Sequence, residues 1–320
     1  MVDNSEKLTL EDELRAKIKV LQESIWERRA DWPLVSRWIS QFEDEDTTHE
    51  DRTHALYLLS NFMYFGTNEI RALLKSLYRD VFRSSVIAEL RQSNPSISMV
   101  EAQDAAELEL RKTRFVSLGN PSESSAFLLY YFRQENEIPR DCFISGAEIF
   151  SNSVSGPMAL HNDDITRYVF IDDMCGSGHQ GAEYSRNTVV PLKHLKPDVK
   201  VYYYALFGTS DGINHLRTLG RFDIVHPVVE LDDSFKCFHP TSRVYKDAPS
   251  SIELSAGRSL ALRFGSKLAP GEPLGYGDGQ LLLGFAYNTP DNSLPIIWSV
   301  GTSAFPWTPV FKRHSKIYLG

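Results

Sequence analysis

The chain has 320 residues, of which 42% are hydrophobic and 24% are charged, so we expect a folded globular protein without long disordered regions. Its formal net charge of −8 at pH 7 provides no overall attraction to nucleic acid. Three scattered cysteines, Cys142, Cys175 and Cys237, are too few for a disulfide framework or a cysteine-rich zinc site. The charged N-terminus and the absence of an apolar stretch of roughly 20 residues predict a cytoplasmic protein without a membrane association.

Residues 9–112 have the periodicity of helices. Apolar residues recur every three or four positions from Leu10 to Leu21, and residues 55–65 are apolar nearly all round. We expect this second segment to be a buried helix that ends at Gly66, followed by a helix over residues 68–82 and a last helix that ends near Lys112. The pattern predicts an N-terminal all-helical domain over residues 1–112.

The periodicity changes after residue 112, where strands alternate with helices. Strands are predicted at residues 114–118, 168–171, 201–207, 222–229 and 280–287, and helices at residues 124–136 and 254–264. Residues 201–207 are continuously apolar, aromatic or β-branched, as in a strand that is buried on both faces. This alternation predicts an α/β fold with a parallel sheet that helices cover on both sides.

A glycine-rich loop follows the predicted strand at residues 168–171. Residues 176–181, Gly-Ser-Gly-His-Gln-Gly, match the dinucleotide fingerprint, which also lies between a strand and a helix. Two features disfavour a dinucleotide site, because residues 172–175 separate the strand from the loop and the acidic residue expected about 20 positions further on is missing.

A ribose 5-phosphate site uses every residue of the same segment. Small residues let backbone amides converge on a phosphate, and a helix that starts after them adds its positive N-terminal end. The adjacent acids Asp172 and Asp173 can accept hydrogen bonds from the ribose hydroxyls, and they are also the candidate catalytic residues and Mg²⁺ ligands. The candidate phosphate-binding residues are Cys175, Gly176, Ser177, Gly178, His179 and Gln180.

At this point the sequence resembles the PRTase-CE family, phosphoribosyltransferase-like proteins of bacterial conflict systems, some of which accompany retron reverse transcriptases. The resemblance extends beyond the loop to three segments, residues 55–66, 273–280 and 288–298. It implies a type I phosphoribosyltransferase-like, Rossmann-like core over residues 113–250, between the helical domain and a C-terminal hood over residues 251–320.

The resemblance also implies a function and partners. The expected substrate is a nucleotide or phosphoribosyl diphosphate whose N-glycosidic bond is made or broken with Mg²⁺, and the expected role is that of a toxic effector in antiviral defence. A retron reverse transcriptase with its msDNA, or another defence-system subunit, is the implied partner.

Two further sets of site residues can be named, of which the first follows from the resemblance and the second from the residue types themselves. The pyrophosphate loop of type I enzymes falls on residues 119–125, with Gly119, Ser122, Ser124 and Ser125 as the candidate ligands. Tyr276, Asn288 and Trp298 are candidates for binding the base, although turn formation and core packing explain these residues equally well.

The sequence departs from the family pattern at two places, which keeps other functions open. The first loop has no Arg or Lys, and Gly176 stands where purine-salvage enzymes have an Asp. A nucleotide-binding sensor or effector subunit without catalysis is therefore an alternative. A metal-dependent nuclease is another, because Asp163 and Asp164 precede the acid pair at residues 172 and 173.

Overall fold

The computed structural model describes residues 9–119, 124–151 and 158–314. Its contacts divide the chain into two compact units. Unit 1 combines the chain up to Asn68 with the chain from Asp232 onward, and unit 2 is Glu69–Leu231. These boundaries differ from the three consecutive segments expected from the sequence, which ended at residues 112, 250 and 320.

Unit 1 is built around helices from both ends of the chain. Helix α1 begins with a capping box. The Thr9 hydroxyl accepts a hydrogen bond from the Asp12 amide, and the Asp12 carboxylate accepts one from the Thr9 amide. The elements of unit 1 are α1 (Leu10–Ser24), α2 (Trp32–Ile39), α3 (His49–Ser60), β1 (Met63–Phe65), η5 (Asp233–Phe235), α11 (Leu254–Leu268), η6 (Tyr276–Asp278), β9 (Leu283–Phe285) and α12 (Pro295–Trp298).

One hydrophobic core joins the two parts of unit 1. The ring centroids of Trp26 and Phe311 are 5.1 Å apart, and Phe42 lies 5.0 Å from both Phe264 and Trp307. These side chains come from opposite ends of the chain and are almost completely buried. The N-terminal helices therefore share their core with residues 237–311, which explains why a separate domain does not end at residue 112.

The apolar segment at residues 55–65 is only partly helical. Helix α3 ends at Ser60, and Met63–Phe65 form strand β1, which pairs in parallel with β9 in the register Met63↔Leu283. The predicted continuous helix was wrong here because an apolar run has no periodicity that separates a buried helix from a buried strand. The predicted strand at residues 280–287 is also shorter, since strand β9 comprises only Leu283–Phe285 and Leu281 forms an isolated bridge with Ser293.

Unit 2 contains the parallel sheet and the helices around it. Its elements are α4 (Thr67–Ser76, which starts at the unit boundary), η1 (Leu77–Arg83), α5 (Ser84–Ser93), α6 (Met99–Arg111), β2 (Thr113–Ser117), α7 (Ser124–Glu135), η2 (Arg140–Cys142), β3 (Phe143–Ile144), η3 (Gly146–Glu148), β4 (Phe150–Ser151), β5 (Ala159–Leu160), β6 (Arg167–Cys175), α8 (His179–Tyr184), η4 (Ser185–Val189), α9 (Val190–Leu195), β7 (Lys200–Thr209), α10 (Ser210–Thr218) and β8 (Ile224–Leu231).

The sheet of unit 2 confirms the predicted parallel α/β fold. Within the described residues it has the strand order β3-β2-β6-β7-β8, and each neighbouring pair is parallel. The chain adds β3 on one side of β2 and then β6 on the other, so the order reverses between β2 and β6. In open α/β sheets such a switch point leaves a crevice at the carboxyl ends of the strands.

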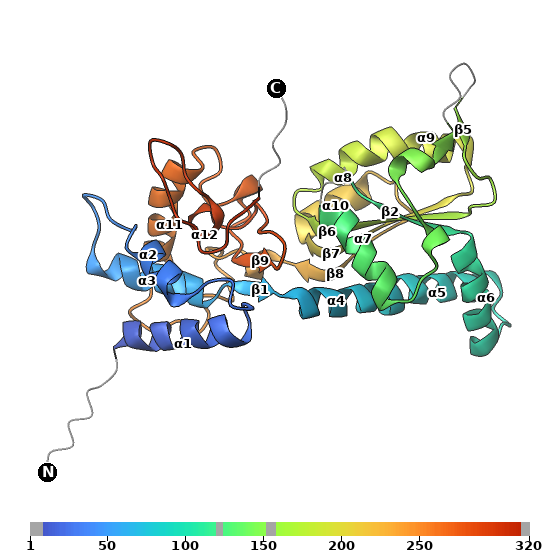
Figure 1. The fold of residues 1–320 in the computed structure, drawn as a ribbon. Coiled ribbons are helices and arrows are strands. Elements are labelled where there is room, and N and C mark those ends of the chain that lie inside the picture. Colours follow the sequence, from blue (N-terminus) through green and yellow to red (C-terminus); the bar gives the residue numbers. More distant parts are fainter. Residues whose placement is uncertain (1–8, 120–123, 152–157, 315–320) are drawn as a thin grey trace, which may run out of the picture. The chain divides into compact units, whose positions relative to one another are not determined.

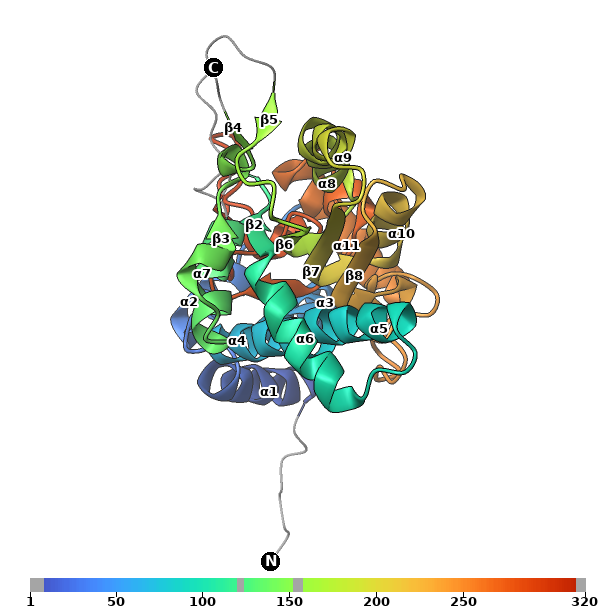
Figure 2. The same cartoon turned by 90° about the vertical axis from the view of Figure 1, so that its right-hand side faces the viewer.

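Helices cover both faces of this sheet (Figures 1 and 2). Helices α8, α9 and α10 lie on one face, where Leu192 and Leu216 pack with Phe170 and Tyr203. Helices α5 and α6 run across the other face. There Arg167, only 5% exposed, pairs with Glu89 of α5 and Glu109 of α6. These contacts explain why residues 69–112 belong to the sheet unit.

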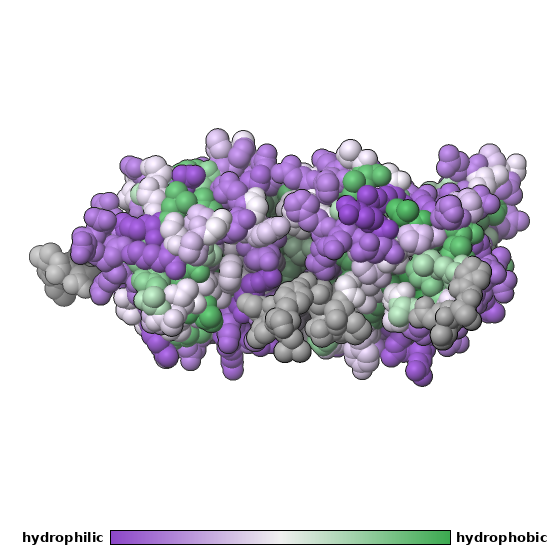
Figure 3. Space-filling model, turned by 90° about the horizontal axis from the view of Figure 1, so that it is seen from above, coloured by the Kyte–Doolittle hydropathy of each residue, from purple (hydrophilic) through white to green (hydrophobic). Residues whose placement is uncertain are grey.

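No helix in the described part of the chain is long and apolar enough to cross a bilayer. On the face drawn in Figure 3, hydrophilic side chains predominate and apolar ones form separate patches.

Candidate functional site

The acid pair and the glycine-rich loop lie at the carboxyl end of β6. This strand extends to Cys175 and so includes Asp172 and Asp173, which the sequence had placed just beyond it. Its neighbour β2 ends four residues earlier in the shared register, because Ser117 pairs with Ile171 and the Leu118 amide donates to the Ile171 carbonyl, whereas β6 continues to Cys175. The loop therefore opens beside the point where the strand order reverses, which is where ligands bind in sheets of this kind.

The backbone of the loop depends on its glycines. Gly178 has a φ of +76° and precedes the first residue of α8. A Cβ on Gly178 would lie 2.7 Å from the Gly212 carbonyl oxygen, so a side chain is excluded there both by conformation and by space. Among the described residues, the amides of Ser177 and Gly178 donate to no protein atom, which leaves them for a ligand.

Thr209 and Gly212 hold the loop in place, although the sequence had not assigned them to the site. The Thr209 hydroxyl donates to the Gly176 carbonyl at 2.6 Å and accepts from the Gly212 amide at 3.0 Å, as the N-cap of α10. A Cβ on Gly212 would approach the Gly176 oxygen to 2.0 Å. The signal in the sequence was a capping Thr with a Gly three residues later, directly after the apolar strand.

The two acids occupy different environments. Asp172 is 8% exposed, and its oxygens accept from the Tyr203 hydroxyl at 2.7 Å and from the Asp173 amide at 3.0 Å. Burial, followed by the neighbouring charge of Asp173, raises the pKa of Asp172 well above its usual range. Asp173 is half-buried, and within the described residues its carboxylate accepts only from the Met174 amide.

The other residues predicted to bind phosphate differ in exposure. The Cys175 side chain is 3% exposed, and burial raises the pKa of its thiol to about 12, which disfavours a nucleophilic thiolate. His179 is exposed at the start of α8, and its ring lies edge-on to His215 of α10, with centroids 5.7 Å apart. Cys175 can therefore contribute only backbone atoms to a ligand in the loop.

The predicted pyrophosphate loop is described at its two ends. Gly119 follows β2 with a φ of +89°, while Ser122 lies outside the described residues. Ser124 and Ser125 begin helix α7, and their side chains are likewise outside the part that is described. The end of β2 and the start of α7 thus bracket this loop beside the carboxyl end of β6.

The residues predicted to bind the base belong to unit 1 and not to the unit that carries the loop. Tyr276 is 42% exposed, whereas the Trp298 indole donates to the Ser293 carbonyl at 2.7 Å. The Asn288 side chain accepts from the His314 amide at 2.9 Å, so it holds the C-terminal segment in place. The bond of Asn288 to His314 joins residues 26 positions apart, and of the two aromatic residues Tyr276 has the more accessible ring.

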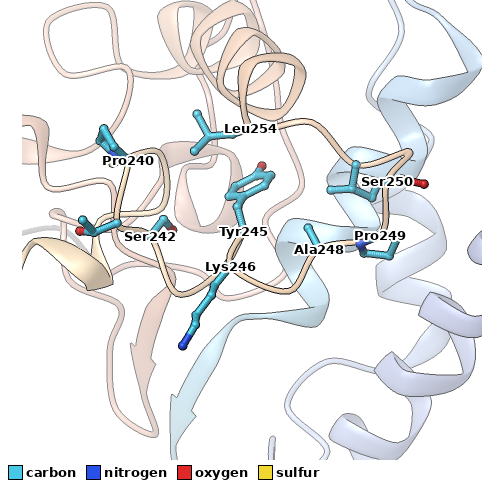
Figure 4. A pocket seen from close by; sticks show the side chains of 10 residues that line it. Pro240, Ser242, Tyr245, Lys246, Ala248, Pro249, Ser250 and Leu254 are labelled. Carbon is cyan, nitrogen blue, oxygen red and sulfur yellow. The ribbon is translucent and has the colours of Figure 1, made fainter.

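Unit 1 also contains a pocket of about 520 Å³ (Figure 4). Residues 240–254 form it, with the Tyr245 ring in its centre and Leu254 on one side. None of the residues predicted for the functional site lines this pocket.

The two acid pairs considered for a metal site lie near opposite ends of β6. Asp164 precedes the strand, in a turn where its amide donates to the Asn162 side chain. Asp172 lies five residues after Arg167, the first residue of β6, which corresponds to roughly 17 Å along the strand. Across residues 9–119, 124–151 and 158–314, no three His, Cys, Asp or Glu side chains are grouped to hold a metal ion. The four acids therefore do not form the two-metal cluster that a nuclease would need.

A sequence model of the PRTase-CE family matches residues 35–313, which span both units. The chain belongs to the PRTase-CE family. The matched range includes the acid pair and the glycine loop, and membership in this family supports a phosphoribosyltransferase-like character in general.

Solved structures also resemble parts of this PRTase-CE protein. Orotate phosphoribosyltransferase from Aeropyrum pernix is 13% identical, with 41% of this chain and 73% of that chain covered at a TM-score of 0.24. The AQ2163 protein from Aquifex aeolicus is 10% identical, with 63% and 86% covered at a TM-score of 0.28. No curated protein sequence matches the chain.

Proposed function

We propose that this PRTase-CE protein binds the 5-phosphoribosyl group either of a nucleotide, whose N-glycosidic bond it breaks, or of phosphoribosyl diphosphate, on which it makes such a bond with release of pyrophosphate. The observation that carries the proposal is the position of the acid pair and the loop at the carboxyl end of β6, beside the switch point of the sheet. Family membership supports phosphoribosyltransferase-like chemistry in general.

The geometry suggests how such a substrate would be held. The free amides of Ser177 and Gly178, at the start of the helical run from His179 to Leu195, suit the 5-phosphate. The carboxylate oxygens of the acid pair can accept hydrogen bonds from the ribose hydroxyls. Oxygen-only ligands also suit Mg²⁺, which binds to one or two carboxylates together with substrate phosphates and would offset their charge.

In the proposed reaction the bond between C1 of the ribose and the base nitrogen breaks, and the electron pair leaves with the base. Pyrophosphate, or water that gives up its proton to the departing base, then forms the new bond to C1, and the intervening state has oxocarbenium character. In the bond-making direction the base nitrogen bonds to C1 and pyrophosphate leaves with the electron pair. The protein would act mainly by positioning and by electrostatic stabilisation. A role in antiviral defence and a retron reverse transcriptase as the partner are proposals supported by the family resemblance.

A nucleotide sensor without turnover is the second candidate. The sequence of residues 119–125 contains no Arg or Lys to hold pyrophosphate, and Gly176 offers no carboxylate to a purine nitrogen. Both features favour a site that binds more readily than it reacts.

Turnover assays separate the candidates. Purified protein is incubated with Mg²⁺ and a panel of nucleotides and phosphoribosyl diphosphate, and free base, pyrophosphate and cleaved nucleic acid are measured. Release of base or pyrophosphate that disappears in Asp173→Ala supports the enzyme, and tight binding without release supports the sensor. Cleavage of nucleic acid, or no binding and no release, contradicts both.

A further inference from the structure

A second pocket of unit 1 lies between the N-terminal halves of helices α1 and α3. Its volume is about 320 Å³, which is enough for a small molecule. Its lining includes Thr9, Glu11, Glu50, Thr53, His54 and Ser251. None of the lining residues is Lys or Arg, and none belongs to the pocket around Tyr245. The only charged side chains at this pocket are therefore carboxylates.

His54 is the buried polar residue of this pocket. It is 3% exposed, and neither of its ring nitrogens forms a hydrogen bond with a described protein atom. Burial lowers the pKa of His54, although neighbouring carboxylates, Glu50 among them, act in the opposite direction. His54 is thus a neutral imidazole near pH 7, and one of its nitrogens can accept a hydrogen bond. Buried polar groups nearly always have a partner, so an unpartnered imidazole beside a pocket points to a ligand.

The two carboxylates at the pocket also keep acceptor oxygens free. Arg15 reaches Glu11 with two of its nitrogens, but both bind the same oxygen, Oε1. Glu50 is exposed in the first turn of α3, and no described side chain is paired with it. A cation with several N–H donors can therefore bond to these acids and to His54 without displacing a protein donor.

We propose that this pocket of unit 1 binds a small organic cation with a primary ammonium group. Glu11 and Glu50 face the positive charge, and His54 accepts one of the N–H hydrogen bonds. An organic cation is favoured over a metal ion, because no three His, Cys, Asp or Glu side chains are grouped as metal ligands in the described part of the chain. The site is independent of the proposed function, since the acid pair and the glycine loop belong to unit 2.

Two isomeric cations test this assignment. Butylammonium and tetramethylammonium have the same composition and the same charge, but only butylammonium has N–H donors. Their dissociation constants are measured by isothermal titration calorimetry on the full chain, for the wild type, Glu50→Gln and His54→Phe. Glu13→Gln is the matched control, because Glu13 is likewise an exposed acid in the first turn of its helix but does not line the pocket.

The wild type should bind butylammonium at least about tenfold more tightly than tetramethylammonium, the usual effect of hydrogen bonds that involve a charged group. Glu50→Gln and His54→Phe should each weaken the binding of butylammonium by about tenfold, and Glu13→Gln should leave it unchanged. His54→Phe should also reduce the preference between the isomers, because it removes an acceptor for N–H. The Tm of the unliganded His54→Phe protein should not fall, since the substitution removes nitrogens that have no partner.

Three results would overturn the inference. Butylammonium could fail to bind at millimolar concentration, the two isomers could bind equally, or Glu13→Gln could weaken binding as much as Glu50→Gln. A purely structural role of His54 would lower the Tm of His54→Phe and leave the preference between the isomers unchanged, which would also contradict the assignment. If His54→Phe does not fold, Glu50→Gln decides the point, because Glu50 is exposed.

Discussion

Replacement of Thr209 by Val should loosen the phosphate loop while the shape of the side chain is kept. The hydroxyl makes two hydrogen bonds, to the Gly176 carbonyl at 2.6 Å and from the Gly212 amide at 3.0 Å. The loss of an N-cap costs about 1 kcal/mol, and a lost hydrogen bond to a partly buried carbonyl costs about another 1 kcal/mol. We therefore expect Thr209→Val to destabilise unit 2 by about 2 kcal/mol.

This loss is measurable by calorimetry and by ligand binding. For a unit of this size, about 2 kcal/mol corresponds to a fall in Tm of roughly 4–8 °C. Thr209→Ser keeps the hydroxyl and should restore most of the stability and of the affinity for ribose 5-phosphate. The control is Thr218→Val, because the Thr218 hydroxyl bonds only to the Asn214 carbonyl within the exposed side of α10. The reasoning is refuted if Thr209→Val and Thr218→Val lower the Tm and the affinity equally.

Other substitutions test the loop and the two cores. Gly212→Ala places a Cβ 2.0 Å from the Gly176 oxygen, so it should cost about 1–3 kcal/mol and weaken ribose 5-phosphate binding, and unchanged affinity would contradict this packing. A hydrogen bond from Lys267 lowers the pKa of Asp44 in the folded protein. The Asp44 carboxylate therefore contributes its full stabilisation of unit 1 above its unfolded pKa of about 3.9. This contribution is lost as the pH falls through the lower pKa of the folded state. In urea titrations Lys267→Met should therefore be less stable than the wild type at neutral pH, and this difference should shrink as the pH falls through the lowered pKa of Asp44. A difference that is constant with pH would contradict the assignment. Phe170 is fully buried, and Phe170→Ala should lose about 3–5 kcal/mol in the same assay, whereas a loss below about 1 kcal/mol would show that the site is not packed as described.

Four strands of the parallel sheet could be predicted because each has its own local signal, whereas the two-residue strand β3 was not predicted. Residues 201–207 are apolar at every position, and β7 is buried on both faces as expected. The phosphate loop was visible for a similar reason, since strand, acids and glycines are contiguous in the sequence. Local sequence patterns were therefore sufficient to predict these core strands and the loop that follows one of them.

Features that depend on distant partners could not be predicted in the same way. Strand β1 forms because it pairs with Leu283–Phe285, which lie more than 200 residues away in the sequence. The Trp26 ring packs in the core of unit 1 against the ring of Phe311, from the other end of the chain. The buried state of Asp172 depends on Tyr203, which is 31 residues away in the sequence. No periodicity reports such pairings, so the unit boundaries and the difference between the two acids appear only in the folded chain.

The most direct test of the account is a crystal structure of the protein with ribose 5-phosphate and Mg²⁺. The account predicts the phosphate at the amides of Ser177 and Gly178 and the ribose beside Asp173. A ligand bound elsewhere, for example in the pocket around Tyr245, with the loop after β6 empty at saturating concentration, would contradict it.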